Sequence, residues 1–367
     1  MSNVYDLRKS ILCLFLCGLT VFSCVVCRDT VSTYILKSVN KVIEYNKTEN
    51  ENRDVETAVN EQYLFSPEGF GSGITATEIS DTPYDILSLM KDAEGMYKKL
   101  KKSGDIKEER FGTSSLTETL GDVDVNNKTS QNISLKELLD KKADYGDITK
   151  DEPYILIYHT HTTEGYELLD KGWYSAAYNS RTDDSRKNMV RVGEELAYRL
   201  EKAGFKVIHD KTVHDYSYTG AYDRSRKTVE KYLKKYPSIK ITLDVHRDAI
   251  HYDSGVKCKP TAVINGKKAA QVMIISGCEG DGVTGFPQWK KNLIFALDIQ
   301  SDVEESYNGL MRPIFFCNRK YNMDMTTCSL LLEFGTDANT LEEAVYSASL
   351  IGERLGNILN NEKNKGK

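Results

Sequence analysis

Apolar and polar residues are distributed unevenly, and their pattern divides the chain into three parts. Residues 11–27 form a continuous apolar run without a charged side chain, and Arg8 and Lys9 precede it. A run of this length lies at the short limit for crossing a bilayer as a helix. The basic flank, and the lack of an A-x-A cleavage site or a good lipobox, predict an uncleaved transmembrane signal anchor. Residues 1–10 then form its short N-terminal flank.

A polar segment follows, and residues 28–148 show little sustained periodicity. Asn, Asp, Glu, Lys, Ser and Thr dominate it, which predicts a solvated stalk or linker. Two stretches have helical features, one beginning near Pro83 and one after Ser134, with Glu137 in the position of a capping box. These stretches leave a small helical docking module for a partner as the alternative.

From residue 149 onward, strand-like and helix-like patterns alternate. Continuous apolar runs, typical of strands buried on both faces, occupy residues 154–159, 205–209, 239–245, 270–276, 314–317 and 328–334. Helical periodicity occupies residues 189–200, 223–235, 289–310 and 340–360. The alternation predicts a single α/β domain over residues 149–367, with a largely parallel sheet flanked by helices. In such sheets, ligands bind beyond the carboxyl ends of the strands.

Composition narrows the classes of function. The net charge of −5 gives no reason to expect a nucleic-acid partner. Four of the eight cysteines lie in the apolar run at residues 11–27, and the other four are scattered through the C-terminal half without C-x-x-C spacing. Export would permit disulfides among those four without fixing their pairing, and a thiolate zinc site is not indicated. The chain also contains no P-loop, G-x-S-x-G or H-E-x-x-H motif. The glycine-rich residues 277–285 predict a loop, and a flap beside the substrate is the alternative interpretation.

Ionisable residues follow several of the predicted strands. His159 and His161 end the first strand, His246 ends the third, and Glu333 ends a later one. With i and i+2 spacing, the first two are expected to point to one face of a strand. Imidazole and carboxylate groups that meet at one sheet edge are what a zinc ion of the catalytic type requires, with an open position for water. A carboxylate that is not a ligand can then relay protons.

Neighbouring polar residues have two interpretations each. Glu164 is interpreted either as a loop cap or as a metal ligand. Asn188, Asp183 and Asp184 lie at a helix start, where they could cap the helix or reach the sheet edge. Arg247 and Asp248 form an ion pair, or they orient the site or hold a substrate carboxylate. The polar loop around His209 favours a surface role for that histidine.

Five segments, in order, carry a resemblance to a known family. YHTHTTEGY, NMVRVGEEL, YDRSRKTVEKYL, LDVHRDA and LLLEFGT, from about Pro153 to the end, resemble the stage II sporulation protein P family. This family consists of membrane-anchored cell-wall hydrolases related to zinc-dependent N-acetylmuramoyl-L-alanine amidases. The resemblance implies an α/β amidase fold, zinc ligands at His161 and His246, and a catalytic acid/base at Glu333. His159 is the alternative to His161 as a ligand. For the carboxylate ligand we choose Glu164. It is followed by Gly165, where Ser or another small residue is expected.

The resemblance also implies a function. It predicts hydrolysis of the amide between N-acetylmuramic acid and L-alanine in peptidoglycan through a zinc-activated water, and cleavage of peptide cross-links, during engulfment of the forespore. The protein would act between the mother-cell and forespore membranes, with the stage II sporulation proteins D and M as partners. Two alternatives stay open: a catalytically inactive scaffold that binds the wall, and a different extracytoplasmic metallohydrolase.

Overall fold

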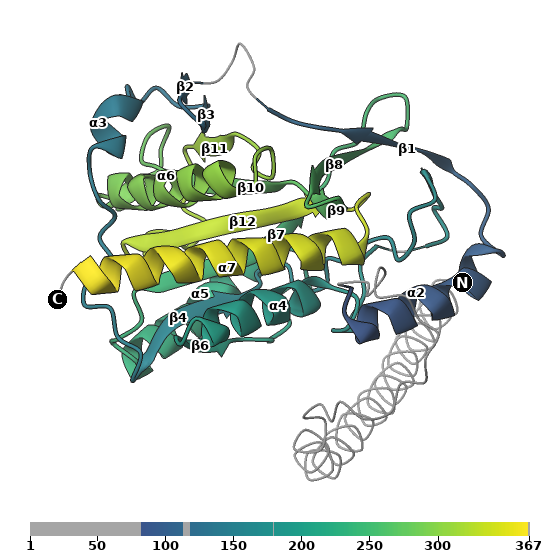
Figure 1. The fold of residues 1–367 in the computed structure, drawn as a ribbon, viewed down its shortest axis with the longest axis horizontal. Helices are drawn as coiled ribbons and strands as arrows, with labels where there is room; N and C mark the ends of the chain where they lie inside the picture. Colours follow the sequence, from purple (N-terminus) through teal and green to yellow (C-terminus); the bar gives the residue numbers. More distant parts are fainter. Residues whose placement is uncertain (1–81, 113–117, 179, 366–367) are drawn as a thin grey trace, which may run out of the picture. The chain divides into compact units, whose positions relative to one another are not determined.

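Two β-sheets organise residues 82–112, 118–178 and 180–365, which are the residues described by the computed structural model (Figure 1). The larger sheet has eight strands in the order β2 (Glu118–Leu120), β3 (Val123–Asn127), β11 (Ile314–Cys317), β10 (Val272–Gly277), β12 (Cys328–Thr336), β7 (Ile241–Asp248), β4 (Pro153–Tyr158) and β6 (Lys206–His209). The smaller sheet has the order β5 (Trp173–Tyr174), β1 (Gly104–Glu109), β8 (Lys257–Ile264) and β9 (Lys267–Ala270). The mixture of strands and helices confirms the α/β class.

Helices cover both faces of the larger sheet. The helices of the described residues are α2 (Tyr84–Tyr97), α3 (Leu135–Leu139), α4 (Met189–Lys202), α5 (Ala221–Lys235), α6 (Trp289–Ser306) and α7 (Leu341–Lys365). In Figure 1, α4, α6 and α7 lie along one face. The apolar run of β4 shows how the two faces are used: Ile155 and Ile157 join the main core, whereas Leu156 packs in a second cluster with Val229 of α5. Burial on both faces explains why this strand is continuously apolar.

The larger sheet is mixed, which corrects the expectation of a largely parallel sheet. β4, β6, β7 and β12 run parallel to their neighbours within this group, but β10 is antiparallel to β12, and β2 is antiparallel to β3. The reason lies between β7 and β10, where the chain forms the antiparallel pair β8–β9 instead of a crossover helix. Without a crossover, the chain enters β10 in the opposite direction. The glycine-rich loop after β10 therefore lies at the sheet edge opposite the carboxyl ends of β7 and β12, which does not support its interpretation as a flap.

A buried glycine fixes the distance between α4 and the sheet. A Cβ atom on Gly193 would lie 2.7 Å from Cε1 of His159 and 2.7 Å from Nε2 of His209. These separations are shorter than a van der Waals contact, so a larger residue would force the helix or the histidines to move. The apolar face of α4 can pack against the sheet at this distance only because residue 193 has no side chain.

Part of the segment expected to be a stalk is packed into this fold. The compact part of the chain includes α2, β1, which pairs with β8, and β3, which pairs with β11. Ile86 of α2 is 1% exposed and lies in the main core. The flank at residues 1–10, the expected anchor at 11–27 and the first part of the expected stalk lie outside the described residues.

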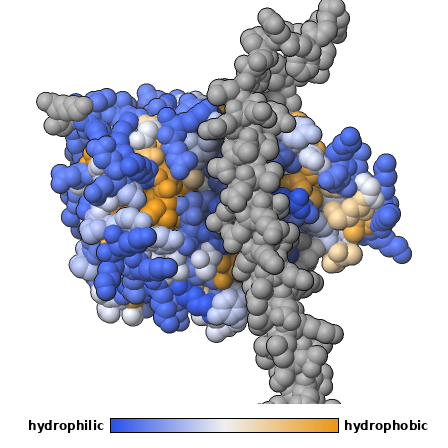
Figure 2. All heavy atoms as spheres, turned by 90° about the horizontal axis from the view of Figure 1, so that it is seen from below, coloured by the Kyte–Doolittle hydropathy of each residue, from blue (hydrophilic) through white to orange (hydrophobic). Residues whose placement is uncertain are grey.

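The face shown in Figure 2 is mostly hydrophilic and bears small apolar patches. Among the described helices, none combines the length and the apolar character needed to cross a membrane. The four cysteines of the C-terminal half, Cys258, Cys278, Cys317 and Cys328, are buried free thiols.

Replacing one buried residue of α2 tests whether this helix belongs to the same cooperative unit as the α/β core. Because Ile86 is 1% exposed, we expect Ile86→Ala to lower the free energy of unfolding by about 2–4 kcal/mol. Its neighbour Leu87 is 40% exposed, so Leu87→Ala is the matched control and should change stability little. Denaturant unfolding of the full chain measures both. Equal, small effects would show that α2 is not part of the cooperative core.

Candidate active site

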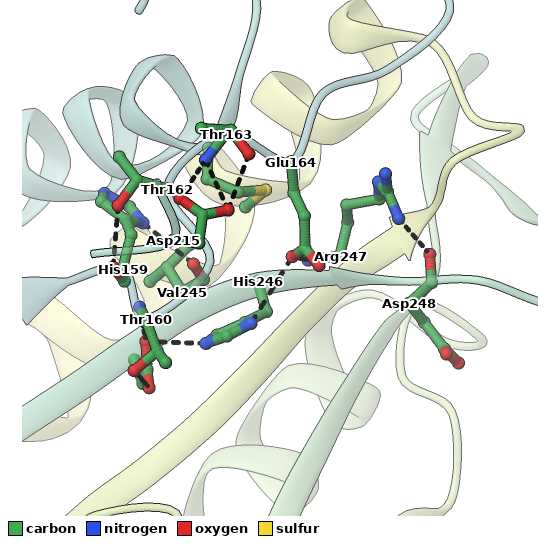
Figure 3. A network of polar contacts seen from close by, with 12 residues as sticks. His159, Thr160, Thr162, Thr163, Glu164, Asp215, Val245, His246, Arg247 and Asp248 are labelled. Atoms are coloured by element: carbon green, nitrogen blue, oxygen red, sulfur yellow. Dashed lines mark hydrogen bonds and ion pairs between the residues drawn. The ribbon is translucent and has the colours of Figure 1, made fainter. Parts of the chain in front are cut away.

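Residues at the carboxyl ends of three neighbouring strands, or just beyond them, come together on the larger sheet. β4 ends at Tyr158, just before the first histidines, and β7 and β12 run parallel with His246 directly opposite Glu333. Residues paired in register on adjacent strands point to the same face. The predicted convergence of polar residues at the carboxyl ends of strands is therefore present, and Figure 3 shows the polar contacts around His246.

His246 lies between two carboxylates. Its Nε2 is 2.8 Å from Oδ1 of Asp244, although this contact lacks the alignment of a hydrogen bond, and its Nδ1 is 3.5 Å from Oε2 of Glu164 (Figure 3). Burial by itself would lower the pKa of His246, but the two carboxylates outweigh it and hold the pKa well above its ordinary value. The imidazole is thus placed where a positive charge is strongly favoured.

Asp244, which sequence reasoning missed, positions this histidine. It is fully buried, and it accepts hydrogen bonds from the backbone N–H of Thr160 at 2.8 Å and from the Thr160 hydroxyl at 2.6 Å. A carboxylate in the middle of an apolar strand is rare unless it is paired. That signal was available, because Asp244 and His246 are two residues apart and share one face of β7.

Glu164 connects the loop after β4 to β7. Its Oε1 accepts from Arg181 Nη2 at 3.0 Å, and its Oε2 accepts from the backbone N–H of Arg247 at 3.3 Å. Burial raises the pKa of Glu164, but the contact with His246 and the charges of Arg247 and His161 have the greater combined effect and lower it to about 2. The side chain is therefore a carboxylate at neutral pH.

His161 faces His246 inside an aromatic enclosure. The two imidazole rings are perpendicular, with centroids 5.2 Å apart. The Tyr218 ring stacks on the His161 ring with centroids 4.7 Å apart, and the Tyr222 ring meets it edge-on with centroids 5.7 Å apart. Burial and the nearby His246 lower the pKa of His161. Its Nδ1 is buried and has no hydrogen-bond partner among the described residues, so a neutral imidazole is held here with an unused nitrogen.

His159 turns away from His246, and the expectation that His159 and His161 share one face is wrong. β4 has already ended at Tyr158, so strand alternation does not apply to these residues. His159 Nδ1 donates to the carbonyl of Val245 at 2.9 Å, which leaves Nε2 to accept from Nε2 of His209 at 2.8 Å. His209 therefore packs against His159 rather than lying in a surface loop.

The remaining predicted residues have structural contacts. Asn188 caps α4 by accepting from the backbone N–H of Val190 at 3.0 Å. Arg247 donates to the carbonyl of Gly165 at 2.9 Å and to the backbone carbonyl, not the carboxylate, of Asp248. Asp248 instead pairs with Arg312 at 2.9 Å.

Glu333 lies beside His246 and lines a pocket of about 410 Å³. Its Oε2 has no hydrogen-bond partner among the described residues. Burial raises the pKa of this carboxyl to about 8; His246 opposes the rise, while Asp248 and Glu164 add to it. Two glutamates of one site are thus held in opposite protonation states, a pattern associated with acid–base chemistry.

The donor chemistry of the site is that of a metal centre, and its groups partly fit one. The fit rests on two imidazoles and a carboxylate in contact, and on the unpartnered Nδ1 of His161. Within residues 82–112, 118–178 and 180–365, however, no three His, Cys, Asp or Glu side chains are arranged closely enough to coordinate one ion. The assignment of metal ligands therefore remains a prediction.

Comparison with known proteins identifies a family. Residues 49–356 match the family described as Stage II sporulation protein P (SpoIIP). Stage II sporulation protein P of Bacillus subtilis (strain 168) is 31% identical over 213 residues, which cover 55% of this chain and 50% of that protein. The chain thus spans about half the length of the curated relative it matches.

Solved structures give a weaker similarity. The catalytic domain of CwlV, an N-acetylmuramoyl-L-alanine amidase from Bacillus (Paenibacillus) polymyxa var. colistinus, matches with a TM-score of 0.35 and 12% identity, over 57% of this chain and 98% of that one. The CwlD amidase from Clostridioides difficile, in complex with the GerS lipoprotein, matches with a TM-score of 0.33 and 12% identity, over 58% of this chain and 100% of that one. At these TM-scores the superpositions support no argument about activity.

The His159–His209 pair should make the fold sensitive to acid. Burial lowers the pKa of His159 to about 4 and that of His209 to about 2, whereas an unfolded histidine titrates near 6.5. Between these values the unfolded chain binds more protons, so stability falls as the pH falls from about 6.5. We expect each histidine to contribute a loss of roughly 2 kcal/mol between pH 7 and pH 5.

The comparison of two variants isolates this effect. Denaturant unfolding of His209→Gln should show a smaller loss of stability between pH 7 and pH 5 than the natural chain. His251, whose side chain is half exposed, provides the control His251→Gln, which should keep the full loss. An unchanged pH dependence in His209→Gln would contradict the role given to the buried pair.

Proposed function

Since the chain belongs to the stage II sporulation protein P family, we propose that it is a peptidoglycan hydrolase of sporulation. The bond cleaved would be the amide between N-acetylmuramic acid and L-alanine, with peptide cross-links as a second possible bond. The observation that carries the proposal is the group of His246, Glu164 and Glu333 at one sheet edge, in which one carboxyl is ionised and the other has a pKa near neutrality.

His161, His246 and Glu164 would hold a zinc ion in this proposal. Imidazole nitrogens and carboxylate oxygens are the ligands that zinc takes in proteins. Nδ1 of His246 and Oε2 of Glu164 lie 3.5 Å apart. A bound zinc ion would lower the pKa of a water molecule to about 7 and polarise the amide carbonyl.

Asp244 would position His246 for this role. By facing Nε2 of the imidazole at 2.8 Å, it favours a proton on that nitrogen and leaves Nδ1 with its lone pair toward Glu164. The two hydrogen bonds from Thr160 keep this carboxylate in place.

Glu333 would transfer the proton. A carboxyl with a pKa raised to about 8 exchanges a proton readily near neutral pH. In its ionised form, Glu333 would take a proton from the attacking water through the unpartnered Oε2 and pass it to the nitrogen of the leaving L-alanine. Asp248 and Arg312, on the pocket side of Glu333, would influence its charge without touching the water.

The wider setting is part of the proposal. Residues 11–27 would anchor the chain in the membrane, with the hydrolase domain outside the cytoplasm between the mother-cell and forespore membranes. Stage II sporulation proteins D and M would be its partners.

Glu333→Gln tests the acid/base role. The substitution keeps the size of the side chain but removes its exchangeable proton, so we expect release of peptides with a free L-alanine amine from purified peptidoglycan to fall by about 10²–10⁴-fold. Zinc content should stay unchanged, because Glu333 is not a proposed ligand. Undiminished release would remove Glu333 from the mechanism, and no release by the natural chain would favour the scaffold alternative.

The two histidines after β4 can be distinguished by metal content. We expect His161→Asn to lose most bound zinc and activity, because a buried ring nitrogen of His161 has no hydrogen-bond partner among the described residues. His159→Asn should retain zinc, since both nitrogens of His159 are already bonded elsewhere. Metal analysis of folded full-length protein gives the answer, with folding checked by circular dichroism. Loss of zinc only in His159→Asn would reverse the ligand assignment.

A further inference from the structure

We infer that the pocket beside Glu333 binds the peptide that leaves the cleaved amide, and that Arg312 recognises a carboxylate of this peptide. The inference rests on the proposed function, because it places the peptide part of the same substrate. The pocket has a volume of about 410 Å³, within the usual range for small-ligand sites.

The sheet itself leads from the reacting groups into the pocket. Glu333 pairs with His246 of β7 on one side and with Met273 of β10 on the other. Two residues further along β10, Ile275 pairs with Phe315 of β11. Paired residues, and residues two apart on one strand, share a face of the sheet. The pocket floor is therefore a continuation of the face that carries His246 and Glu333.

The next strand adds a polar group to this floor. Phe315 pairs with Asn126 of β3, which also lines the pocket. Oδ1 of Asn126 is buried and has no hydrogen-bond partner among the described residues. A buried acceptor without a donor is unfavourable unless a ligand or water supplies one. The N–H group of a peptide bond is a suitable donor.

Arg312 supplies the only guanidinium among the described residues that line this pocket. Its side chain is 9% exposed, and its Nη1 donates to Oδ2 of Asp248 at 2.9 Å. The guanidinium carbon lies 5.1 Å from the ring centroid of Phe111, which restricts its orientation. The remaining N–H groups of such a fork are suited to a carboxylate, which they can bind with two parallel hydrogen bonds.

The combination favours a peptide. Met273, Ile275, Phe315 and Phe111 provide an apolar surface that suits an alanine methyl group. Asn126 provides an acceptor and Arg312 a cation, and the carboxyl groups of Asp248 and Glu333 complete the polar lining. A stem peptide that begins with L-alanine and carries a free α-carboxylate on its second residue, a γ-linked D-glutamate, matches this set.

Binding of two tripeptides to the full chain tests the inference. The first is L-alanyl-γ-D-glutamyl-diaminopimelate with a free α-carboxylate on the glutamate, and the second carries a carboxamide at that position. By isothermal titration calorimetry we expect the natural chain to bind the first at least tenfold more tightly, the effect of about one charge-assisted hydrogen bond. Arg312→Gln should bind the two equally, and Arg319→Gln, at an exposed arginine outside the pocket, should keep the preference.

Two further variants guard against loss of folding in Arg312→Gln. Arg312→Lys keeps the charge but cannot form the fork, and Phe111→Leu removes the ring beside the guanidinium. Both should reduce the preference several-fold. Equal binding of the two tripeptides by the natural chain, or a full preference in Arg312→Gln, Arg312→Lys and Phe111→Leu, would overturn the inference.

These readouts are separate from hydrolysis, because neither tripeptide contains the scissile amide. A preference for the carboxylate without any release of peptides from peptidoglycan would support the pocket and contradict the proposed reaction. Release of peptides from peptidoglycan without a preference for the carboxylate tripeptide would support the proposed reaction and contradict the role of the pocket.

Discussion

The parallel, in-register pairing of β7 with β12 is the constraint on which the site depends. It places His246 directly beside Glu333, although the two residues lie far apart in the sequence. A shift of one residue in this register would turn one of the two side chains to the opposite face of the sheet. The buried apolar residues that alternate with them, among them Val245 and Leu332, fix the register because they too must stay inside. The packing of the core and the geometry of the site are thus determined by the same set of contacts.

Electrostatic balance follows from that arrangement. The carboxylates of Asp244 and Glu164 and the Oε2 atom of Glu333 are buried, in an environment where charged groups are stable only with partners. His246 and the arginines stabilise the charge on Glu164, and Glu333 has no such partner on its Oε2. The difference in partners, rather than in residue type, sets the difference between the two glutamate pKa values. Two glutamates of the same site therefore differ in protonation: Glu164 is ionised at neutral pH, whereas the pKa of Glu333 is raised.

Much of the fold and part of the site could be predicted from the sequence. The apolar runs of β4, β7, β10 and β12 and the periodicity of α4 are strong local signals, and they located His161, His246 and Glu333 at strand ends. Local pattern does not report which strand a segment will pair with, so the mixed sheet and the packing of α2, β1 and β3 were missed. The side on which His159 lies was also missed, because it depends on the residue at which β4 ends. Asp244 and Arg312 act through neighbours on other strands, and a single sequence does not reveal those neighbours.

The reversed direction of β10 has a practical consequence for work with this protein. Because β10 is antiparallel to β12, the turn at residues 278–285 emerges at the edge of the sheet farthest from the carboxyl ends of β7 and β12. Asp281 and Gly282 in this turn are exposed. A fluorescent dye, an affinity tag or a fused reporter inserted there would project away from the strand ends that carry His246 and Glu333. The turn thus offers an attachment point for imaging or immobilising the molecule with its reactive edge left clear.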